Sequence, residues 1–229
     1  MNQPERQSEI KPKVPASGHS AETGSEVSDQ ESQETGKVVI ISGPSGVGKT
    51  SVLRRLFSQS KLPLVESVSA TTRPQRPGEE AGRSYHYLSE EEFLKHRDNN
   101  DFLEYCEVFG YGHWYGTLHQ PVTTGLKKGN WIVLEVDVEG AGKVLKTYPD
   151  AITIFIHPGS IEELERRLRG RGTESEEVLK RRLEVAKHEL DASSIYRHTV
   201  INQSVEQTVN DICEPVSYTH LTLPTICSV

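Results

Sequence analysis

The stretch Val38-Val39-Ile40-Ile41-Ser42-Gly43-Pro44-Ser45-Gly46-Val47-Gly48-Lys49-Thr50 decides the fold of this chain. Its second part, from Gly43 to Thr50, matches the phosphate-loop pattern G-x-x-x-x-G-K-[ST]. An apolar run typical of a buried strand precedes the pattern, and a helical pattern over Ser51–Ser60 follows it. Glycines let such a loop turn its backbone N–H groups toward phosphate oxygens, at the positive end of the helix dipole. The stretch therefore predicts a nucleoside triphosphate site.

The side chains at the end of this loop suggest specific roles. We expect the ammonium group of Lys49 to reach the β- and γ-phosphates, and the hydroxyl of Thr50 to bind Mg²⁺ together with the phosphates and water. The residues expected to contact the triphosphate are Gly43, Pro44, Ser45, Gly46, Val47, Gly48, Lys49, Thr50 and Ser51.

Beyond the loop, apolar runs alternate with helical patterns. Further strands are predicted to end at Ser67–Ser69 and to cover Trp131–Val136, Ala151–Ile156 and Thr199–Ile201. Helices are predicted over Ser89–Asn99, Ser160–Arg169 and Glu176–Tyr196, the first two opened by capping boxes. Strands that alternate with crossover helices indicate an α/β fold, with a mostly parallel core sheet covered by helices on both faces.

Composition and charge exclude several classes of protein. The chain has 26 basic and 33 acidic side chains, a net charge of −7, so it offers no global attraction for nucleic acid or an anionic membrane. It contains no apolar run near the roughly 18 residues of a membrane span, and we expect no signal peptide. Cys106, Cys213 and Cys227 are widely spaced, without a C-x-x-C pair, which favours a reducing, cytoplasmic location.

The two ends of the chain differ from its middle. Residues 1–36 hold six apolar, seven acidic and three basic side chains, so we expect a disordered tail that cannot bury enough surface to fold. Residues 37–212 are predicted to form the folded domain. A helical pattern ends near Ile212, and Glu214–Val229 has two prolines and no helical or strand period. Our hypothesis is that residues 213–229 are an atypical, non-native tail from a frameshift or a cloning read-through.

A second motif narrows the class of enzyme. In Ser69-Ala-Thr-Thr-Arg73-Pro-Gln-Arg76-Pro-Gly-Glu-Glu-Ala-Gly-Arg-Ser-Tyr85, two arginines three residues apart stand beside hydroxyl groups, an arrangement that suits a phosphate dianion. Here the chain resembles the guanylate kinase family, from about Lys37 to Ile212. The resemblance implies a P-loop nucleoside monophosphate kinase fold, with a five-stranded core sheet, a small mixed GMP-binding region at about 69–120 and a helical lid at about 167–185. It also implies that Ser69, Arg73, Arg76 and Tyr85 contact GMP.

Two further segments, Phe102-Leu103-Glu104 and Trp114-Tyr115-Gly116-Thr117, resemble those with which the family reads guanine. The resemblance assigns the Glu104 carboxylate and the Thr117 hydroxyl to the base and Tyr115 to the phosphate. The connector Phe109–His113 is longer than we expect at this hairpin, which leaves the role of Trp114 open.

The strand Trp131–Val136 carries carboxylates at its end, as a Walker B segment does. We assign Glu135 and Asp137 to the GMP side of the site, although the family usually has Asp at the first of these positions. Asp137 is our candidate for organising Mg²⁺-bound water or the GMP-side arginines, and a purely structural role for Glu135 stays open.

Arginines gather in the segment that resembles the family's lid. The resemblance maps the catalytic arginines onto Arg167, Arg171 and Arg182, which act with Lys49. Guanidinium groups there stabilise the negative charge that spreads during phosphoryl transfer. The alternative is a charged helix face with pairs such as Glu163–Arg167, which explains Arg166 and Arg169 well and Arg171 poorly. Near the end of the chain, Val200-Ile201-Asn202 resembles the family's adenine-side element, so Asn202 joins the predicted ATP-binding residues.

The resemblance implies the reaction ATP + GMP ⇌ ADP + GDP, by in-line transfer with Mg²⁺, in purine nucleotide metabolism. The expected partners are ATP and GMP, with no nucleic acid or membrane, and we expect a monomer or a weak homodimer. One alternative is a related kinase for another small phosphate ester, such as a ribosyl bisphosphate, against which Glu104 and Thr117 argue. The other is a non-catalytic guanylate-kinase-like module that binds phosphopeptides, which the complete phosphate loop disfavours.

Overall fold

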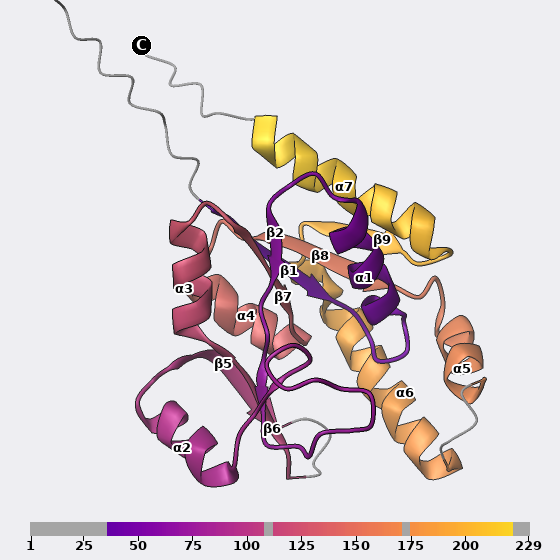
Figure 1. The fold of residues 1–229 in the computed structure, drawn as a ribbon. Helices are drawn as coiled ribbons and strands as arrows, with labels where there is room; N and C mark the ends of the chain where they lie inside the picture. The colour runs from indigo at the N-terminus through magenta and orange to yellow at the C-terminus, as the bar shows by residue number, and fades with distance from the viewer. Residues whose placement is uncertain (1–35, 108–111, 171–174, 222–229) are drawn as a thin grey trace, which may run out of the picture. The chain divides into compact units, whose positions relative to one another are not determined.

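The computed structural model describes residues 36–107, 112–170 and 175–221, all within one unit of the chain, Gln33–Val229 (Figure 1). The strands are β1 (Val38–Ser42), β2 (Leu64–Glu66), β3 (Ala70–Thr71), β4 (His86–Tyr87), β5 (Phe102–Glu107), β6 (Trp114–Leu118), β7 (Trp131–Glu135), β8 (Ile152–His157) and β9 (His198–Ile201). The helices are α1 (Lys49–Gln59), α2 (Glu90–Asp98), α3 (His119–Lys127), α4 (Val138–Thr147), α5 (Ile161–Arg169), α6 (Glu176–Asp191), the 3-10 helix η1 (Ala192–Ile195) and α7 (Val205–Leu221).

The core sheet has five strands in the order β2-β7-β1-β8-β9, and every pairing is parallel. In the centre, Val39 of β1 pairs with Val133 of β7 and Ile152 of β8. Parallel strands end at the same edge, so the loop after β1 lies beside the end of β7, where Glu135 stands. Ligands of open α/β sheets bind at this edge. The predicted α/β fold with a parallel five-stranded sheet is confirmed.

Helices cover both faces of this sheet, because successive side chains of a strand point to opposite faces. Val39 and Ile41 pack with α1 and α7 on one face. Ile40 belongs to the cluster on the other face, which includes side chains of α3 and α4. Figure 1 shows α1 and α7 lying together, away from α3 and α4.

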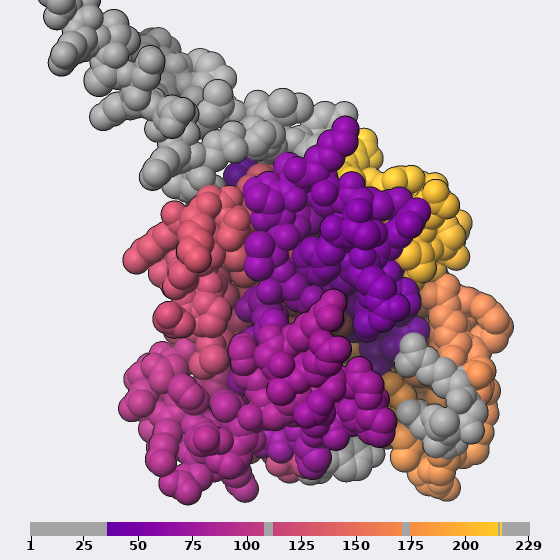
Figure 2. Space-filling model, in the orientation of Figure 1, coloured from indigo at the N-terminus to yellow at the C-terminus, as the bar shows by residue number. Residues whose placement is uncertain are grey.

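A second, mixed sheet follows the order β4-β3-β6-β5. The pairing of β3 with β4 is parallel, whereas β6 pairs antiparallel with both β3 and β5. Phe93 of α2 is fully buried and stacks on Phe102 of β5, with ring centroids 4.5 Å apart. In Figure 2 the indigo-to-magenta segments lie over the middle of the face, with the orange of α5 and α6 at one side.

The second predicted strand is divided between the two sheets. Strand β2 ends at Glu66, and the backbone N–H of Ser67 adds one hydrogen bond to Val133 at 2.9 Å. The carbonyl of Ser69 accepts from His86 at 2.9 Å, so this residue already belongs to the second sheet. The expectation of one strand through Ser67–Ser69 was wrong, because periodicity does not reveal which partner strand each residue meets.

Two helices end at different residues from those expected. Helix α6 stops at Asp191 and continues as the 3-10 turn η1, short of Tyr196. Helix α7 runs to Leu221 through Pro215, so the expected end near Ile212 was wrong. Val209, Ile212 and Val216 are buried in the core cluster that α1 also joins, and their burial offsets the hydrogen bond that a proline removes. Residues 1–35 and 222–229, within the two predicted tails, lie outside the described residues.

Candidate active site

The phosphate loop is held in a backbone conformation that requires its glycines. Gly43, Gly46 and Gly48 have φ values of 153°, 94° and 100°, in the region that side-chain-bearing residues rarely adopt. A Cβ on Gly43 would stand 2.4 Å from the carbonyl oxygen of Ile156, and one on Gly46 would stand 2.5 Å from a methyl of Leu168. Gly48 caps α1 in the left-handed conformation. Strand β8 and helix α5 therefore pack closely against the loop.

Lys49, the first residue of α1, folds back over this loop. Its Nζ donates to the carbonyl oxygen of Gly43 at 2.7 Å and lies 3.9 Å from Oε1 of Glu135, at the end of β7. A lysine ammonium at this place offers a point charge and three donors to a phosphate. Thr50 and Ser51 follow on the first turn of α1, where both are exposed.

Two of the predicted catalytic arginines touch the same loop. Arg182 of α6 donates to the hydroxyl of Ser45 at 2.6 Å. Arg167 of α5 donates to the carbonyl oxygens of Val47 at 3.2 Å and Asn202 at 2.7 Å, and forms an ion pair with Glu163. The structure thus brings both arginines to the phosphate loop. The third predicted arginine, Arg171, lies outside the described residues.

Asn202, directly after β9, holds the phosphate loop by a hydrogen bond to its backbone. It is 5% exposed, its amide nitrogen donates to the carbonyl oxygen of Val47 at 2.7 Å, and its amide oxygen accepts from the Thr208 hydroxyl at 3.0 Å. A Cβ on Gly48 would stand 2.8 Å from the Asn202 amide nitrogen. Asn202 therefore fixes the shape of the loop, and its contact with ATP itself stays a prediction.

On the other side of the site, Arg73 forms an ion pair that the sequence did not lead us to expect. The guanidinium group makes two hydrogen bonds to the Glu79 carboxylate, at 2.8 and 3.1 Å, and a third to the Tyr115 hydroxyl at 3.0 Å. The bonds from Arg73 lower the pKa of Glu79 to about 2. Tyr87 also donates to this carboxylate, at 2.7 Å. Arg73 is 7% exposed, so Glu79 holds a buried cation in place.

Other predicted GMP contacts surround this pair. The ring of Tyr85 lies 5.4 Å below the Arg73 guanidinium and 5.8 Å from the Tyr115 ring, and burial raises its pKa to about 12. The Arg76 side chain is exposed, whereas its backbone N–H donates to Glu79 at 2.8 Å. Ser69 stands one residue before β3 and is half-buried.

Glu104 and Thr117 form a buried pair across neighbouring strands. Thr117 donates to Oε1 of Glu104 at 2.6 Å. Thr117 is 1% exposed and Glu104 is 6% exposed. Burial raises the pKa of Glu104, as does the nearby charge of Asp137, whereas the hydrogen bond from Thr117 lowers it. An ionised carboxylate accepts hydrogen bonds on both oxygens, which suits a base that presents adjacent N–H donors.

The carboxylates of Glu135, the last residue of β7, and Asp137, two residues later, occupy different environments. Glu135 is exposed and faces Lys49. Asp137 caps α4, with Oδ1 accepting from the Gly140 N–H at 2.6 Å and Oδ2 from the Cys106 thiol at 3.5 Å. The structure thus sets Glu135 toward the phosphate loop and Asp137 toward Glu104, a division that the sequence left open.

Sequence reasoning missed two carboxylates near the site. Glu79 lies in the quoted Arg73–Tyr85 stretch, and its charge between two arginines was the available signal. Glu189 of α6 lies three residues after buried Ala186, so its place on the apolar face was a signal too. Burial raises the pKa of Glu189 to about 7, while the charge of Lys49 acts in the opposite direction.

The donor set around Thr50 fits a metal ion that arrives with phosphates. Within residues 36–107, 112–170 and 175–221, no group of three or more His, Cys, Asp or Glu side chains could hold a metal ion alone. A hydroxyl on the first turn of α1 supplies one oxygen, which suits Mg²⁺ because this ion usually keeps several waters and binds substrate phosphates.

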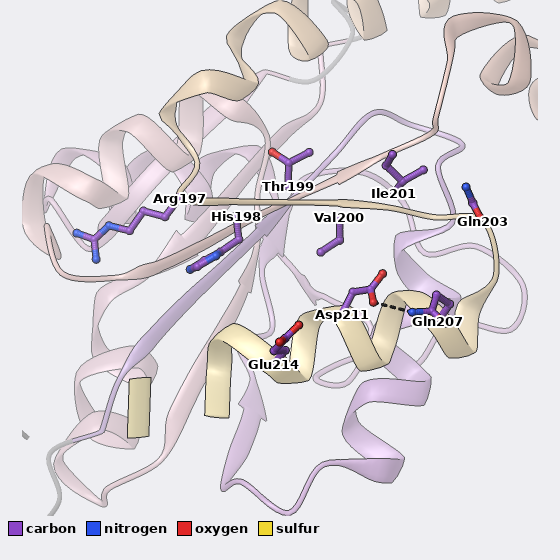
Figure 3. Close-up of a pocket in the computed structure, with 9 residues that line it drawn as sticks. All are labelled: Arg197, His198, Thr199, Val200, Ile201, Gln203, Gln207, Asp211 and Glu214. Carbon is purple, nitrogen blue, oxygen red and sulfur yellow. Dashed lines mark hydrogen bonds between the residues drawn. The ribbon is translucent and has the colours of Figure 1, made fainter. Parts of the chain in front are cut away.

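A hollow of about 570 Å³ lies elsewhere, between edge strand β9 and helix α7 (Figure 3). It is lined by Arg197, His198, Thr199, Val200, Ile201, Gln203, Gln207, Asp211 and Glu214. Gln207 donates to Asp211 across one turn of α7 at 2.7 Å. None of the predicted site residues lines this hollow, so we place the active site at the phosphate loop, where the reactive side chains meet.

No helix in the described part of the chain is long and apolar enough to cross a membrane.

Comparisons with known proteins agree with this geometry. The model of the family "Guanylate kinase" matches residues 35–218. A guanylate kinase of Rhodopirellula baltica is 52% identical over 188 residues, which cover 82% of this chain and 90% of that protein. A guanylate kinase of Caldanaerobacter subterraneus subsp. tengcongensis is 43% identical over 180 residues, covering 79% and 86%.

A solved structure is similar as well. The crystal structure of guanylate kinase from Anaplasma phagocytophilum superposes with a TM-score of 0.68 at 29% sequence identity. The match covers 82% of this chain and 88% of that one. The similarity thus extends over the core sheet and the second sheet together.

Proposed function

The chain belongs to the guanylate kinase family, and we propose that it transfers the γ-phosphoryl group of ATP to GMP at the site between Lys49 and Glu104, giving ADP and GDP. One observation carries the proposal: a complete phosphate loop and the buried carboxylate of Glu104 both lie beside residues at the C-terminal end of β7. Lys49 lies 3.9 Å from Glu135 of β7. Two residues later, Asp137 lies beside Glu104.

The phosphate loop and its arginines serve the ATP side. Backbone N–H groups at the start of α1 bind phosphate oxygens, and Lys49 neutralises charge on the β- and γ-phosphates. Arg167 and Arg182, already seated on the loop, stabilise the charge that spreads over the migrating group. Bound Mg²⁺ would supply further neutralisation, held by the Thr50 hydroxyl and the ATP phosphates.

The second sheet serves the GMP side. Arg73, Arg76, Tyr85 and Tyr115 hold the GMP phosphate, while Glu104 and Thr117 hold the guanine. A phosphate oxygen of GMP attacks the γ-phosphorus in line, and no covalent enzyme intermediate forms. Catalysis rests on positioning and electrostatic stabilisation, without a strong base.

Partners and location follow from the substrates. We propose that the chain acts as a monomer or weak homodimer in the cytoplasm, where ATP and GMP are available and thiols stay reduced. Cys106 and Cys213 are free thiols in the described part of the chain. We propose no nucleic-acid or membrane partner.

A coupled assay of ADP release over a panel of nucleoside monophosphates tests the function. We expect rapid turnover with GMP and little with AMP, CMP or UMP. Turnover that disappears in Lys49→Ala excludes a contaminating kinase. Properly folded protein that leaves GMP unphosphorylated would overturn the proposal.

A further inference from the structure

Three successive residues of β5 contact the beginning of α4. Oε2 of Glu104 lies 3.1 Å from the point where a Cβ on Gly140 would stand, and Oδ1 of Asp137 lies 3.1 Å from the same point. Lys143 donates from Nζ to the carbonyl oxygen of Tyr105 at 2.6 Å. The thiol of Cys106 donates to Oδ2 of Asp137 at 3.5 Å. Strand β5 of the second sheet is thus hydrogen-bonded to the core at Tyr105 and Cys106, and Glu104 lies against Gly140.

The contacts bring two carboxylates together at the guanine side of the site. Their oxygens lie within about 6 Å of each other, because both are 3.1 Å from one point. Like charges at this spacing repel, and burial strengthens the repulsion. The pair keeps a fixed geometry only if other groups hold each carboxylate. Thr117 holds Glu104, and the Gly140 N–H holds one oxygen of Asp137.

Cys106 holds the other oxygen of Asp137. Burial raises the pKa of this thiol, and so does the charge of Asp137, so the sulfur keeps its proton and acts as a donor. Lys143 places a positive charge beside the same strand, with Nζ 5.4 Å from the centre of the Tyr105 ring. The charge of Lys143 favours the ionised form of Glu104.

We propose that Cys106 and Lys143 are positioning residues for GMP: they tie β5 to Asp137 and α4, and so fix the spacing of the carboxylates Glu104 and Asp137. The inference rests on the proposed function and adds two residues to it. Neither side chain needs to touch GMP. Cys106 acts through Asp137, and Lys143 acts through the backbone of β5 next to Glu104.

Steady-state kinetics of four variants and one control variant test this role. Cys106→Ala and Lys143→Ala should each raise the KM for GMP about 5- to 20-fold, while kcat stays within about threefold and the KM for ATP is unchanged. Cys106→Ser and Lys143→Arg keep a donor and should restore most of the affinity. Lys146→Ala removes the same charge one turn later on α4, where the side chain is exposed, and serves as the matched control.

A double-mutant comparison separates positioning from general packing. If Cys106 acts through Asp137, Cys106→Ala should add no further loss in an Asp137→Asn background. An unchanged KM for GMP in both alanine variants, or equal rises in the KM values for GMP and ATP, would overturn the inference. Thermal melts identify an alanine variant that folds poorly. For that position, the ratio of the KM for GMP to the KM for ATP in the Ser or Arg variant tests the inference instead. Wild-type protein inactive on GMP would instead overturn the proposed function.

Discussion

Arg182 of α6 donates a 2.6 Å hydrogen bond to the hydroxyl of Ser45 in the phosphate loop, across 137 residues of sequence. Arg167 of α5 reaches the carbonyl oxygen of Val47 in the same loop. Helices α5 and α6 pack together through Leu164, Leu168, Leu179 and Ala186, so the two arginines share one support. Two helices packed through a small apolar cluster therefore bring two guanidinium groups to the place where the γ-phosphate is expected.

Removing Arg182 tests whether this contact serves catalysis. Arg182→Ala should lower kcat about 10²- to 10³-fold, because a donor aimed at developing charge is lost. The control is Lys180→Ala, which removes an exposed positive charge from the same helix and should leave kcat within about twofold. Equal activity of both variants would leave Arg182 as a structural contact only.

Lys49 should be needed for the chemical step itself. Lys49→Ala removes the point charge at the β- and γ-phosphates, and we expect kcat to fall at least 10²- to 10³-fold. The variant loses one hydrogen bond, from Nζ to the Gly43 carbonyl oxygen, and we expect the melting temperature to change little. Single-turnover measurements check the prediction, and near-normal kcat would contradict the phosphate-loop assignment.

Base specificity should depend on Glu104. Guanine presents N1–H and N2–H₂ as adjacent donors, whereas adenine turns a lone pair toward the carboxylate. Because Glu104 is buried and Thr117 donates only to its Oε1, AMP offers no N–H donor to Oε2. Sites of this kind reject such analogues by roughly 10⁴–10⁵. Glu104→Ala should sharply lower kcat/KM for GMP and leave the KM for ATP nearly unchanged. A variant that keeps its preference for GMP over AMP would show that guanine is read elsewhere.

Thr117→Val tests the smaller partner of this pair. The hydroxyl donates to Glu104 at 2.6 Å, and its loss should cost about 1 kcal/mol of GMP binding, or roughly fivefold in KM. Thr117→Ser keeps the donor and should behave like the wild type. Calorimetric titration with GMP measures the difference, and a Val variant with unchanged affinity would remove Thr117 from the site.

The Arg73–Glu79 pair predicts a specific loss of stability in acid. The pKa of Glu79 is about 2 in the folded chain and near 4.3 when unfolded. The carboxylate of Glu79 therefore stabilises the fold fully above about pH 5, and this contribution disappears as the pH falls toward 2. Glu79→Gln should be less stable than the wild type at pH 7, and the difference should shrink below pH 4. Urea unfolding at several pH values measures the difference in the free energy of unfolding between the two proteins. A difference that does not change with pH would contradict the predicted role of the Glu79 carboxylate.

Local sequence determined the parts of the site that lie within one strand, loop and helix. Gly43–Thr50 predicts the phosphate loop because the spacing of its glycines, Lys49 and Thr50 is itself the geometry of the site. The serines Ser89 and Ser160 likewise begin helices α2 and α5, since a capping hydrogen bond spans only three residues.

Tertiary structure alone decided which distant side chains meet. The order of the parallel strands puts Glu135 beside Lys49. The contact of β5 with the beginning of α4 puts Cys106 beside Asp137. Helix α7 also continues beyond Pro215, although proline disfavours a helix interior, because Val216 packs in the core. Local spacing contains no information on strand order or on which face of the sheet a helix covers, because both depend on burying the apolar faces of the whole chain together.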